Sequence, residues 1–418
     1  METNRRAAWT PPPRPEWVAA VNREGAFLDL KGVVPLDPQS LIATAVANTG
    51  LSDFGSDDWR EPFEIFCRGL DEEAGLNLMG RIMTRSDILR TLESRLHVEE
   101  AYRRHPEIED EEIEKPIMIV GQGRTGTSAL LNLLAADPAN RAELSWEAMY
   151  PRADPAPEEE TRLRALAHEQ LRMWSRVTPE LDATHEFGCD FPTESIDVQV
   201  LSWQSPAWQV LWGQTPSLFE YVARNSMIHA VRYEKRVLKL LQWRRPKRRW
   251  VLKNPQGLSY LKETFEVFPD LGLVWTHRDP IIAMSSMINL VGIFAWIRSD
   301  AYLAGGTVEN VTTPAGAAAM ITDPIDMIES GFIPRERLLN VAYDDFVSDP
   351  LGVATAIYKH FGIEMTDASH AALKRHVDDH PRSKRPAHRY NLGADKSRSA
   401  EREAFRRYQD YFNVPDEV

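Results

Sequence analysis

The 418-residue sequence predicts an α/β fold in which helices flank a parallel β-sheet. From residue 117 onward, short β-branched or apolar runs alternate with segments of helical length, a pattern typical of parallel β-α-β units. A glycine-rich turn joins the first run directly to an apolar helix. Residues 1–114 carry helical patterns and end in an acidic stretch. We therefore expect a helical extension at 1–114 and an α/β domain at 115–418, with a helical insert at about 158–244.

In the N-terminal part we expect an extended arm at residues 11–15 and helices at 38–48, 59–74 and 84–102. The third helix has the clearest apolar face. Thr84 and Asp87 suit a capping box at its start, and His105-Pro106 ends it because proline cannot continue the hydrogen-bond ladder. The acidic run at 107–114 is then a linker to the first strand.

Four strand–turn–helix units are expected in the α/β domain. The expected strand and helix of each are 117–120 with 129–136, 250–253 with 258–268, 271–277 with 281–290, and 338–343 with 351–361. Strands that alternate with helices of this length predict a sheet covered by helices.

Composition and charge exclude several classes of protein. The net charge of −13 disfavours nucleic-acid binding, and two cysteines are too few for a disulfide framework or a cysteine metal site. The N-terminus has no apolar signal segment, and polar residues interrupt the most apolar stretch, 281–297. We expect a cytoplasmic protein with no stable membrane insertion and no nucleic-acid partner, and leave a homodimer open.

The segment from Gly121 to Ser128 is the most informative part of the chain. Gly121, Gly126 and Ser128 fit the phosphate-binding pattern G-x-x-x-x-G-K-[ST], but Thr127 replaces the lysine and a cation stands inside the loop at Arg124. A strand–loop–helix of this kind points backbone N–H groups and a helix N-terminus at an anion. The relocated cation disfavours a Mg²⁺–nucleoside triphosphate as the ligand.

The loop resembles the 5′-phosphosulfate loop of sulfotransferases, written P-[KR]-[ST]-G-[ST]-[ST], with Gly123 in place of the proline. Arg278 and Ser286 resemble the family's 3′-phosphate motif, an arginine followed eight positions later by a serine. Tyr343 stands in a tyrosine-acid-acid-hydrophobic segment whose tyrosine lies near the adenine in the family, although a core tyrosine fits equally well.

A late basic run with Lys384 and Arg385 resembles the C-terminal loop that closes over the 3′-phosphate. A solvated loop is the alternative there. From residue 116 to the C-terminus, the chain resembles bacterial, actinobacterial-type members of the cytosolic sulfotransferase-like proteins.

This resemblance implies the donor 3′-phosphoadenosine-5′-phosphosulfate (PAPS), the product PAP, a small-molecule acceptor and an in-line transfer without a metal. The donor-binding residues that it implies are Gly123, Arg124, Thr125, Gly126, Thr127, Ser128, Arg278, Ser286, Tyr343, Lys384 and Arg385. Two alternatives stay open. One is a protein of this fold that binds the nucleotide but has altered or different chemistry, and the other is a phosphate-loop kinase or NTPase.

For catalysis we expect Arg124 to stabilise charge on the leaving 5′-phosphate, because a guanidinium binds phosphate oxygens bidentately. Lys253, in a Lys-x-Pro element, would supply a second cation. Many related sequences have a histidine base at the position that is Gly257 here. The candidate bases are therefore His185 and Glu147, unless the chemistry differs or the substrate supplies its own base.

The acceptor is specified only by aromatic residues. Those that stand out in and after the insert are Trp203, Trp208, Trp212, Phe219, Tyr221, Phe294 and Trp296. Aromatic side chains mostly form cores, but they also line pockets. We expect a lipophilic or aromatic alcohol or amine as the acceptor.

Overall fold

The computed structural model describes residues 9–184, 188–210, 214–301, 303, 308–381, 392 and 395–418. In this part of the chain a five-stranded, fully parallel sheet has the strand order β2-β3-β1-β4-β5. The strands are β1 (Ile117–Val120), β2 (Asn140–Arg141), β3 (Arg249–Lys253), β4 (Gly272–His277) and β5 (Leu338–Ala342). The predicted α/β fold is confirmed.

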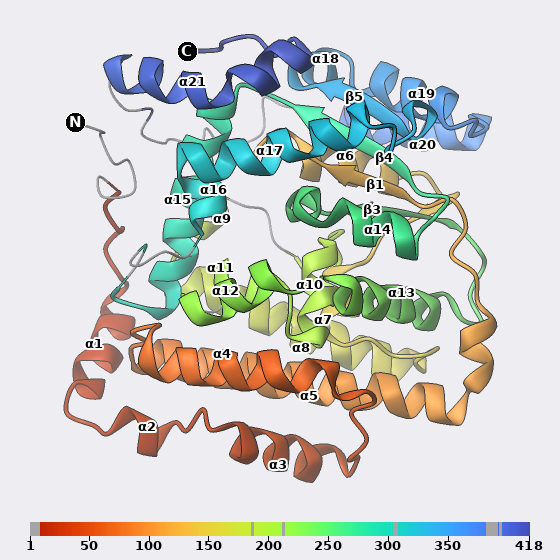
Figure 1. Cartoon of the computed structure of the whole chain (residues 1–418). Helices are drawn as coiled ribbons and strands as arrows, with labels where there is room; N and C mark the ends of the chain where they lie inside the picture. Colours follow the sequence, from red (N-terminus) through yellow and green to blue (C-terminus); the bar gives the residue numbers. More distant parts are fainter. Residues whose placement is uncertain are drawn as a thin grey trace.

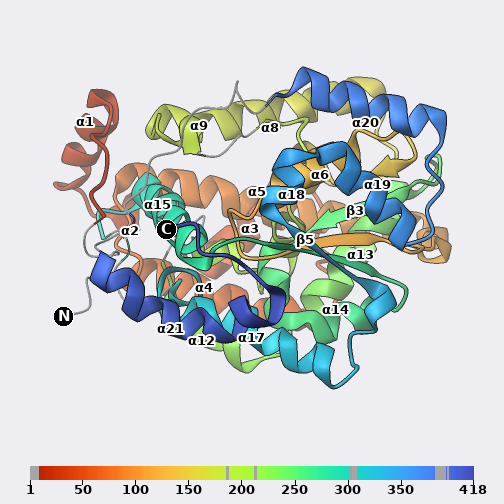
Figure 2. The same cartoon turned by 90° about the horizontal axis from the view of Figure 1, so that it is seen from above.

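Strand β1 is buried on both faces. Its successive side chains point to opposite faces of the sheet, so they pack alternately against two layers of helices. Ile117 and Ile119 belong to a core shared with α6 (Thr127–Ala135), α19 (Pro350–His360) and α20 (Asp367–Asp379). Met118 and Val120 belong to the larger core on the other face, which includes α14 (Leu261–Val267) and α17 (Pro314–Glu329). Figure 2 shows these two sets of helices on opposite sides of the sheet.

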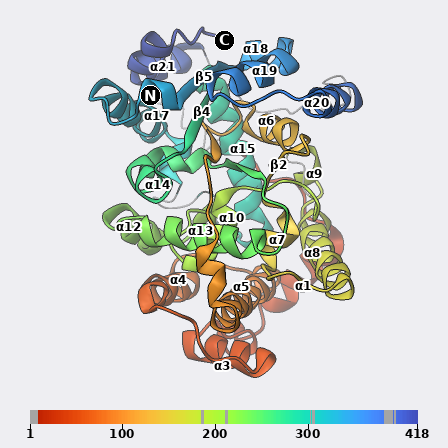
Figure 3. The same ribbon diagram turned by 90° about the vertical axis from the view of Figure 1, so that its right-hand side faces the viewer.

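The N-terminal helices form a layer that shares the large core, rather than a separate body. They run along the lower part of Figure 1 and occupy one end of the molecule in Figure 3, with α21 at the other. Their bounds are α1 Glu16–Gly25, α2 Leu30–Val33, α3 Pro38–Thr49, α4 Arg60–Glu72 and α5 Leu78–Arg104. Buried residues of α1, α3, α4 and α5 are continuous with the core on one face of the sheet.

The predicted start of the third N-terminal helix is wrong. Helix α5 begins at Leu78, where the side chain of Asn77 accepts a hydrogen bond from the N–H of Gly80 at 2.9 Å. Thr84 and Asp87 therefore lie inside the helix, and both are buried. The local pattern suits a cap, but the helix extends further back because its earlier turns also pack into the core.

The segment between β2 and β3 is helical. Its helices are α7 Ser145–Met149, α8 Pro157–Val177, α9 Leu181–Thr184, α10 Ser195–Gln199, α11 Ala207–Val210, α12 Pro216–Arg224 and α13 Ile228–Gln242. The remaining α-helices in the described residues are α15 Pro280–Arg298, α16 Glu309–Thr312, α18 Tyr343–Ser348 and α21 Asp395–Phe412.

Helix α15 is long and apolar enough to cross a membrane by length and composition. In the structure, however, 89% of its most apolar window is buried inside the protein. This is the environment of a core helix. Helix α15 lies between the sheet and the N-terminal layer. Its residues are next to the carboxyl ends of the strands, where ligands of such sheets bind.

Candidate active site

The loop after β1 has the conformation that an anion-binding loop requires. Gly121, Arg124 and Gly126 have positive φ values of 143°, 77° and 93°. Gly126 is the N-cap of α6, so the first N–H groups of that helix have no intrahelical acceptors. The Thr125 hydroxyl donates to the carbonyl of Gln122 at 2.7 Å and lies 2.6 Å from the Thr276 hydroxyl, which fixes the loop to β4.

The residues predicted to bind the donor come together around this loop. Nε of Arg124 donates to the Ser286 hydroxyl at 3.0 Å, which joins the two predicted phosphate motifs. The Arg278 guanidinium lies 4.0 Å from the centre of the Tyr343 ring. A side chain at Gly126 would approach that ring to 3.3 Å. Lys384 and Arg385 lie outside the described residues.

Arg278 is engaged by a carboxylate from the C-terminal segment. Its Nε and one terminal nitrogen each lie 3.0 Å from a carboxylate oxygen of Glu417. The N–H of Glu417 donates to Asp279 at 2.8 Å, and Arg402 pairs with the same Asp279 carboxylate at 3.0 Å. An anionic group therefore already contacts the arginine predicted to hold the 3′-phosphate.

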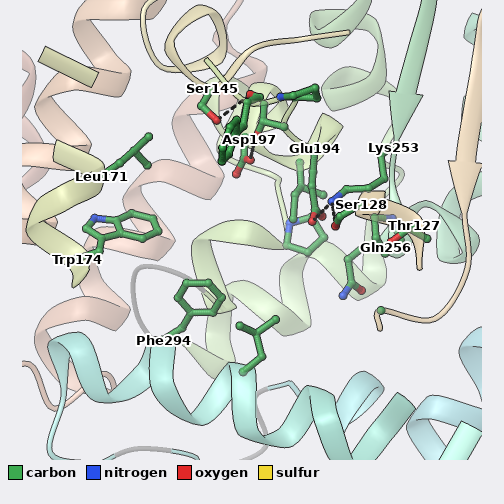
Figure 4. Close-up of a pocket in the computed structure, with 18 of the residues that line it drawn as sticks. Thr127, Ser128, Ser145, Leu171, Trp174, Glu194, Asp197, Lys253, Gln256 and Phe294 are labelled. Carbon is green, nitrogen blue, oxygen red and sulfur yellow. Dashed lines mark hydrogen bonds and ion pairs between the residues drawn. The ribbon is translucent and has the colours of Figure 1, made fainter. Parts of the chain in front are cut away.

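Lys253, at the end of β3, joins the loop to a carboxylate that sequence reasoning missed. Its Nζ donates to the Ser128 hydroxyl at 2.8 Å and lies 2.7 Å from Glu194, as Figure 4 shows. Glu194 precedes α10 and ends the polar segment that begins at His185. The sequence-based prediction names His185 in this segment as a candidate base and does not include Glu194.

The absence of a histidine at position 257 has a steric reason. A Cβ at Gly257 would lie 2.9 Å from the side chain of Asn254. The Asn254 amide donates to the Tyr260 hydroxyl at 2.9 Å, which holds the side chain in place. A residue larger than glycine would push on this buried network.

An apolar cavity of about 150 Å³ opens beside Lys253 and Glu194. Figure 4 shows Leu171, Trp174 and Phe294 across the cavity from this pair. Other apolar residues that line it are Met149, Phe191, Ile196, Met287 and Leu290. The cavity is close in size to an apolar cavity of about 150 Å³ known to bind benzene.

The aromatic residues expected to mark the acceptor pocket are mostly elsewhere. Trp203 and Trp208 stack with ring centres 4.5 Å apart and pack on Phe63 and Phe66 of α4, inside the core. Phe294 does line the cavity. Trp212 lies outside the described residues. The aromatic lining of the cavity comes instead from Trp174, Phe191 and Phe294. Of these three residues, only Phe294 was expected from the sequence.

A second carboxylate, Asp197, also lines the cavity. Burial, together with a smaller contribution from the neighbouring charge of Glu194, raises the pKa of Asp197 to about 6. The Thr193 hydroxyl donates to this carboxylate. Glu194 and Asp197 thus form a pair at the start of α10, with Glu194 in contact with Lys253.

Of the two predicted bases, only Glu147 can be placed, because His185 lies outside the described residues. The Glu147 carboxylate pairs with Arg141 at 2.7 Å and accepts from the N–H of Leu144 at 3.3 Å. Glu147 lines a separate, wider cavity of about 950 Å³, which shares Arg124, Ser128 and Lys253 with the apolar one. Its contacts indicate a residue that anchors α7.

The model of the sulfotransferase family matches residues 116–367 of this chain. The chain belongs to the sulfotransferase family. It is therefore an enzyme of a family that transfers sulfuryl groups. This match spans the loop, Lys253, the Arg278–Ser286 pair and Tyr343, so the predicted membership is confirmed.

Solved structures and curated relatives support this family membership. The chain is similar to sulfotransferase STF1 from Mycobacterium tuberculosis H37Rv, with 27% identity, a TM-score of 0.74, and coverage of 88% of this chain and 98% of that one. It is also similar to STF9 from Mycobacterium avium, with 26% identity, a TM-score of 0.78, and coverage of 91% and 97%. The Mycobacterium tuberculosis omega-hydroxy-beta-dihydromenaquinone-9 sulfotransferase Stf3 is 23% identical over 63% of this chain and 67% of its own length. This protein is thus an actinobacterial-type member of the sulfotransferase family.

Proposed function

We propose that this enzyme transfers a sulfuryl group from PAPS to a hydroxyl or amine of a small lipophilic or aromatic acceptor. The observation that carries the proposal is the position of Lys253. Its ammonium joins Ser128, in the anion-binding loop, to Glu194, at the edge of an apolar cavity. An anionic donor and an apolar acceptor would therefore meet at one cation.

The described residues fit the donor. Its 5′ side suits the loop, where backbone N–H groups at the start of α6 and the Arg124 guanidinium converge. Its 3′-phosphate suits Arg278 and Ser286, and its base suits the ring of Tyr343, over which Arg278 lies. When bound, the donor supplies an electrophilic sulfur and a phosphate leaving group.

The chain's own residues then have distinct tasks. Glu194 takes the proton from the acceptor hydroxyl or amine as the new bond to sulfur forms, since its carboxylate faces the cavity beside Lys253. Arg124 and Lys253 stabilise the negative charge that accumulates as the bond from sulfur to the bridging oxygen breaks. His185 and Glu147 remain predictions for the base, and the contacts of Glu194 favour it over Glu147.

The lipophilic nature of the acceptor rests on the cavity lining. Trp174, Phe294 and Leu171 offer apolar surface to whatever lies beside Lys253. The curated relative Stf3 is named for a lipophilic alcohol, omega-hydroxy-beta-dihydromenaquinone-9. An apolar alcohol or phenol suits this lining better than a highly anionic glycan does.

The decisive experiment combines nucleotide binding with turnover. PAP at about 100 times its Kd should stabilise the fold by about 2.7 kcal/mol in a thermal-shift assay, and ATP with Mg²⁺ should not. Incubation with PAPS and a panel of alkylphenols and alkanols should yield sulfate esters by mass spectrometry. Stabilisation by ATP–Mg²⁺ alone would favour the kinase alternative. PAP binding without a sulfated product from any acceptor would favour a nucleotide-binding protein with other chemistry.

A further inference from the structure

Opposite Lys253, the apolar cavity ends at a buried cluster of charged side chains. Helix α5 contributes Asp87 and Arg90, and both line the cavity while each is only 5% exposed. Asp87 pairs with Arg298, whose guanidinium lies 5.1 Å from the centre of the Trp174 ring. Because Trp174 lies across the cavity from Lys253 in Figure 4, the cluster is at the end remote from the reacting group.

A close approach of two helices builds this cluster. A Cβ at Gly80 would lie 1.9 Å from the carbonyl oxygen of Arg298, so glycine lets the start of α5 meet the end of α15. Asp87 then reaches Arg298 with an N–O distance of 2.6 Å. The Asp87 carboxylate thus forms its ion pair with Arg298 and not with Arg90.

Among the described residues, no carboxylate forms an ion pair with Arg90, so its positive charge is not balanced there. One terminal nitrogen donates to the carbonyl of Met149 at 3.1 Å, and its Nε is buried without a hydrogen-bond partner. In the described part of the chain, no carboxylate oxygen lies within 4.0 Å of its guanidinium nitrogens. Buried charges are normally paired, since an unpaired one loses hydration without compensation.

We infer that Arg90 binds a carboxylate of the acceptor, and that the acceptor is an apolar alcohol or phenol carrying this carboxylate at the end remote from its reacting hydroxyl. This inference deepens the proposed function and rests on it. The lining of the cavity matches such an acceptor from end to end. Glu194 and Lys253 lie at one end, aromatic and aliphatic side chains in the middle, and the Arg90 guanidinium at the other end. A guanidinium matches a carboxylate in geometry as well as in charge.

The test uses 4-hydroxyphenyl alkanoates with side chains of increasing length, each matched to the alkylphenol that lacks the carboxylate. At one chain length, the acid should exceed its alkylphenol in kcat/KM by about 10- to 100-fold, the size of a charge-assisted hydrogen bond. Arg90→Met should remove this preference, and Arg90→Lys should keep part of it. Arg85→Met is the matched control, because Arg85 lies on the same helix and donates to Pro35 outside the cavity.

Binding separates this inference from the proposed function. Calorimetry of the acids with the full chain, with and without PAP, requires no turnover. Binding of acids that depends on Arg90 would support the inference even if no sulfate ester forms. A wild-type protein that prefers the uncharged alkylphenols, or a preference for acids that survives in a folded Arg90→Met variant, would overturn it. Stabilisation by PAP serves as the check that each variant is folded.

Discussion

The loop at the donor end of the active site is one continuous stretch of chain, between Gly121 and Ser128, whereas the acceptor end is built from side chains of α5, α8, α10 and α15. At the donor end, hydrogen bonds such as that between Thr125 and Gln122 fix a short stretch of chain. At the acceptor end, residues as distant in sequence as Arg90 and Phe294 line one cavity. The loop can therefore keep one donor while single substitutions in the cavity wall change the acceptor.

The largest expected effect is at the junction of the two ends. Glu194→Gln removes the proposed base and should lower kcat by about 10²–10⁴-fold, while PAP binds as before because the loop is unchanged. Steady-state kinetics and PAP calorimetry test both parts. Glu147→Gln is the matched control, since that carboxylate pairs with Arg141 instead of Lys253. A larger loss in Glu147→Gln than in Glu194→Gln would return the role to Glu147, one of the two bases predicted from the sequence.

At the donor end, Arg124→Ala should lower kcat by about 10²-fold or more, and should change the donor's KM less than it changes kcat. The reason is that charge on the leaving phosphate grows in the transition state. The Arg124 side chain also contacts Ser286, so PAP affinity has to be measured separately. Unchanged kcat with weaker PAP binding would reduce Arg124 to a donor-binding residue.

The same contrast explains what the sequence could predict. Loop, strand and helix follow one another within Ile117–Ala135, so their pattern is local and visible in the chain. Arg278 and Ser286 share one strand end and helix, and their spacing is equally readable. The parallel sheet followed from the repeated strand–helix units.

The acceptor end could not be predicted because its residues meet only through tertiary packing. The local sequence pattern around Asp87 suits a helix cap, yet Asp87 forms an ion pair with Arg298 of a different helix, α15. Glu194 carries no motif of its own, and its role follows from a contact with Lys253. A useful signal was present in the two acids three positions apart, Glu194 and Asp197, at the end of a polar segment.

Asp197 offers a test of the acceptor end through stability. Its pKa is raised to about 6 from an ordinary value of 3.8, so the folded protein holds this proton more tightly than the unfolded chain. The contribution to stability is full at pH values below the unfolded pKa and is lost as pH rises through about 6. Asp197→Asn should therefore raise the free energy of unfolding at pH 8 by on the order of 1–3 kcal/mol and change it little near pH 4. Urea unfolding at the two pH values measures this, and equal effects at both would contradict the raised pKa.

The smallest expected effect concerns the donor end and the carboxylate that already contacts Arg278. A 3′-phosphate that uses Arg278 has to displace Glu417, whose carboxylate lies 3.0 Å from the guanidinium. Both side chains are partly exposed, at 16% and 24%, so the pair is worth less than about 1 kcal/mol. Glu417→Gln should therefore tighten PAP binding by up to about fivefold.

Three controls show whether an effect of Glu417→Gln on PAP binding comes from its contact with Arg278. A nucleotide without the 3′-phosphate should bind Glu417→Gln and the wild type equally, because it does not compete for Arg278. In an Arg278→Ala background, which should itself weaken PAP, Glu417→Gln should have no further effect, as a double-mutant cycle would reveal. Glu403→Gln, which breaks an exposed pair with Arg406 on α21, controls for the loss of one surface charge. If Glu417→Gln weakened PAP binding instead, Glu417 would be holding Arg278 in place for the phosphate, and the donor end would depend on side-chain packing as much as the acceptor end does.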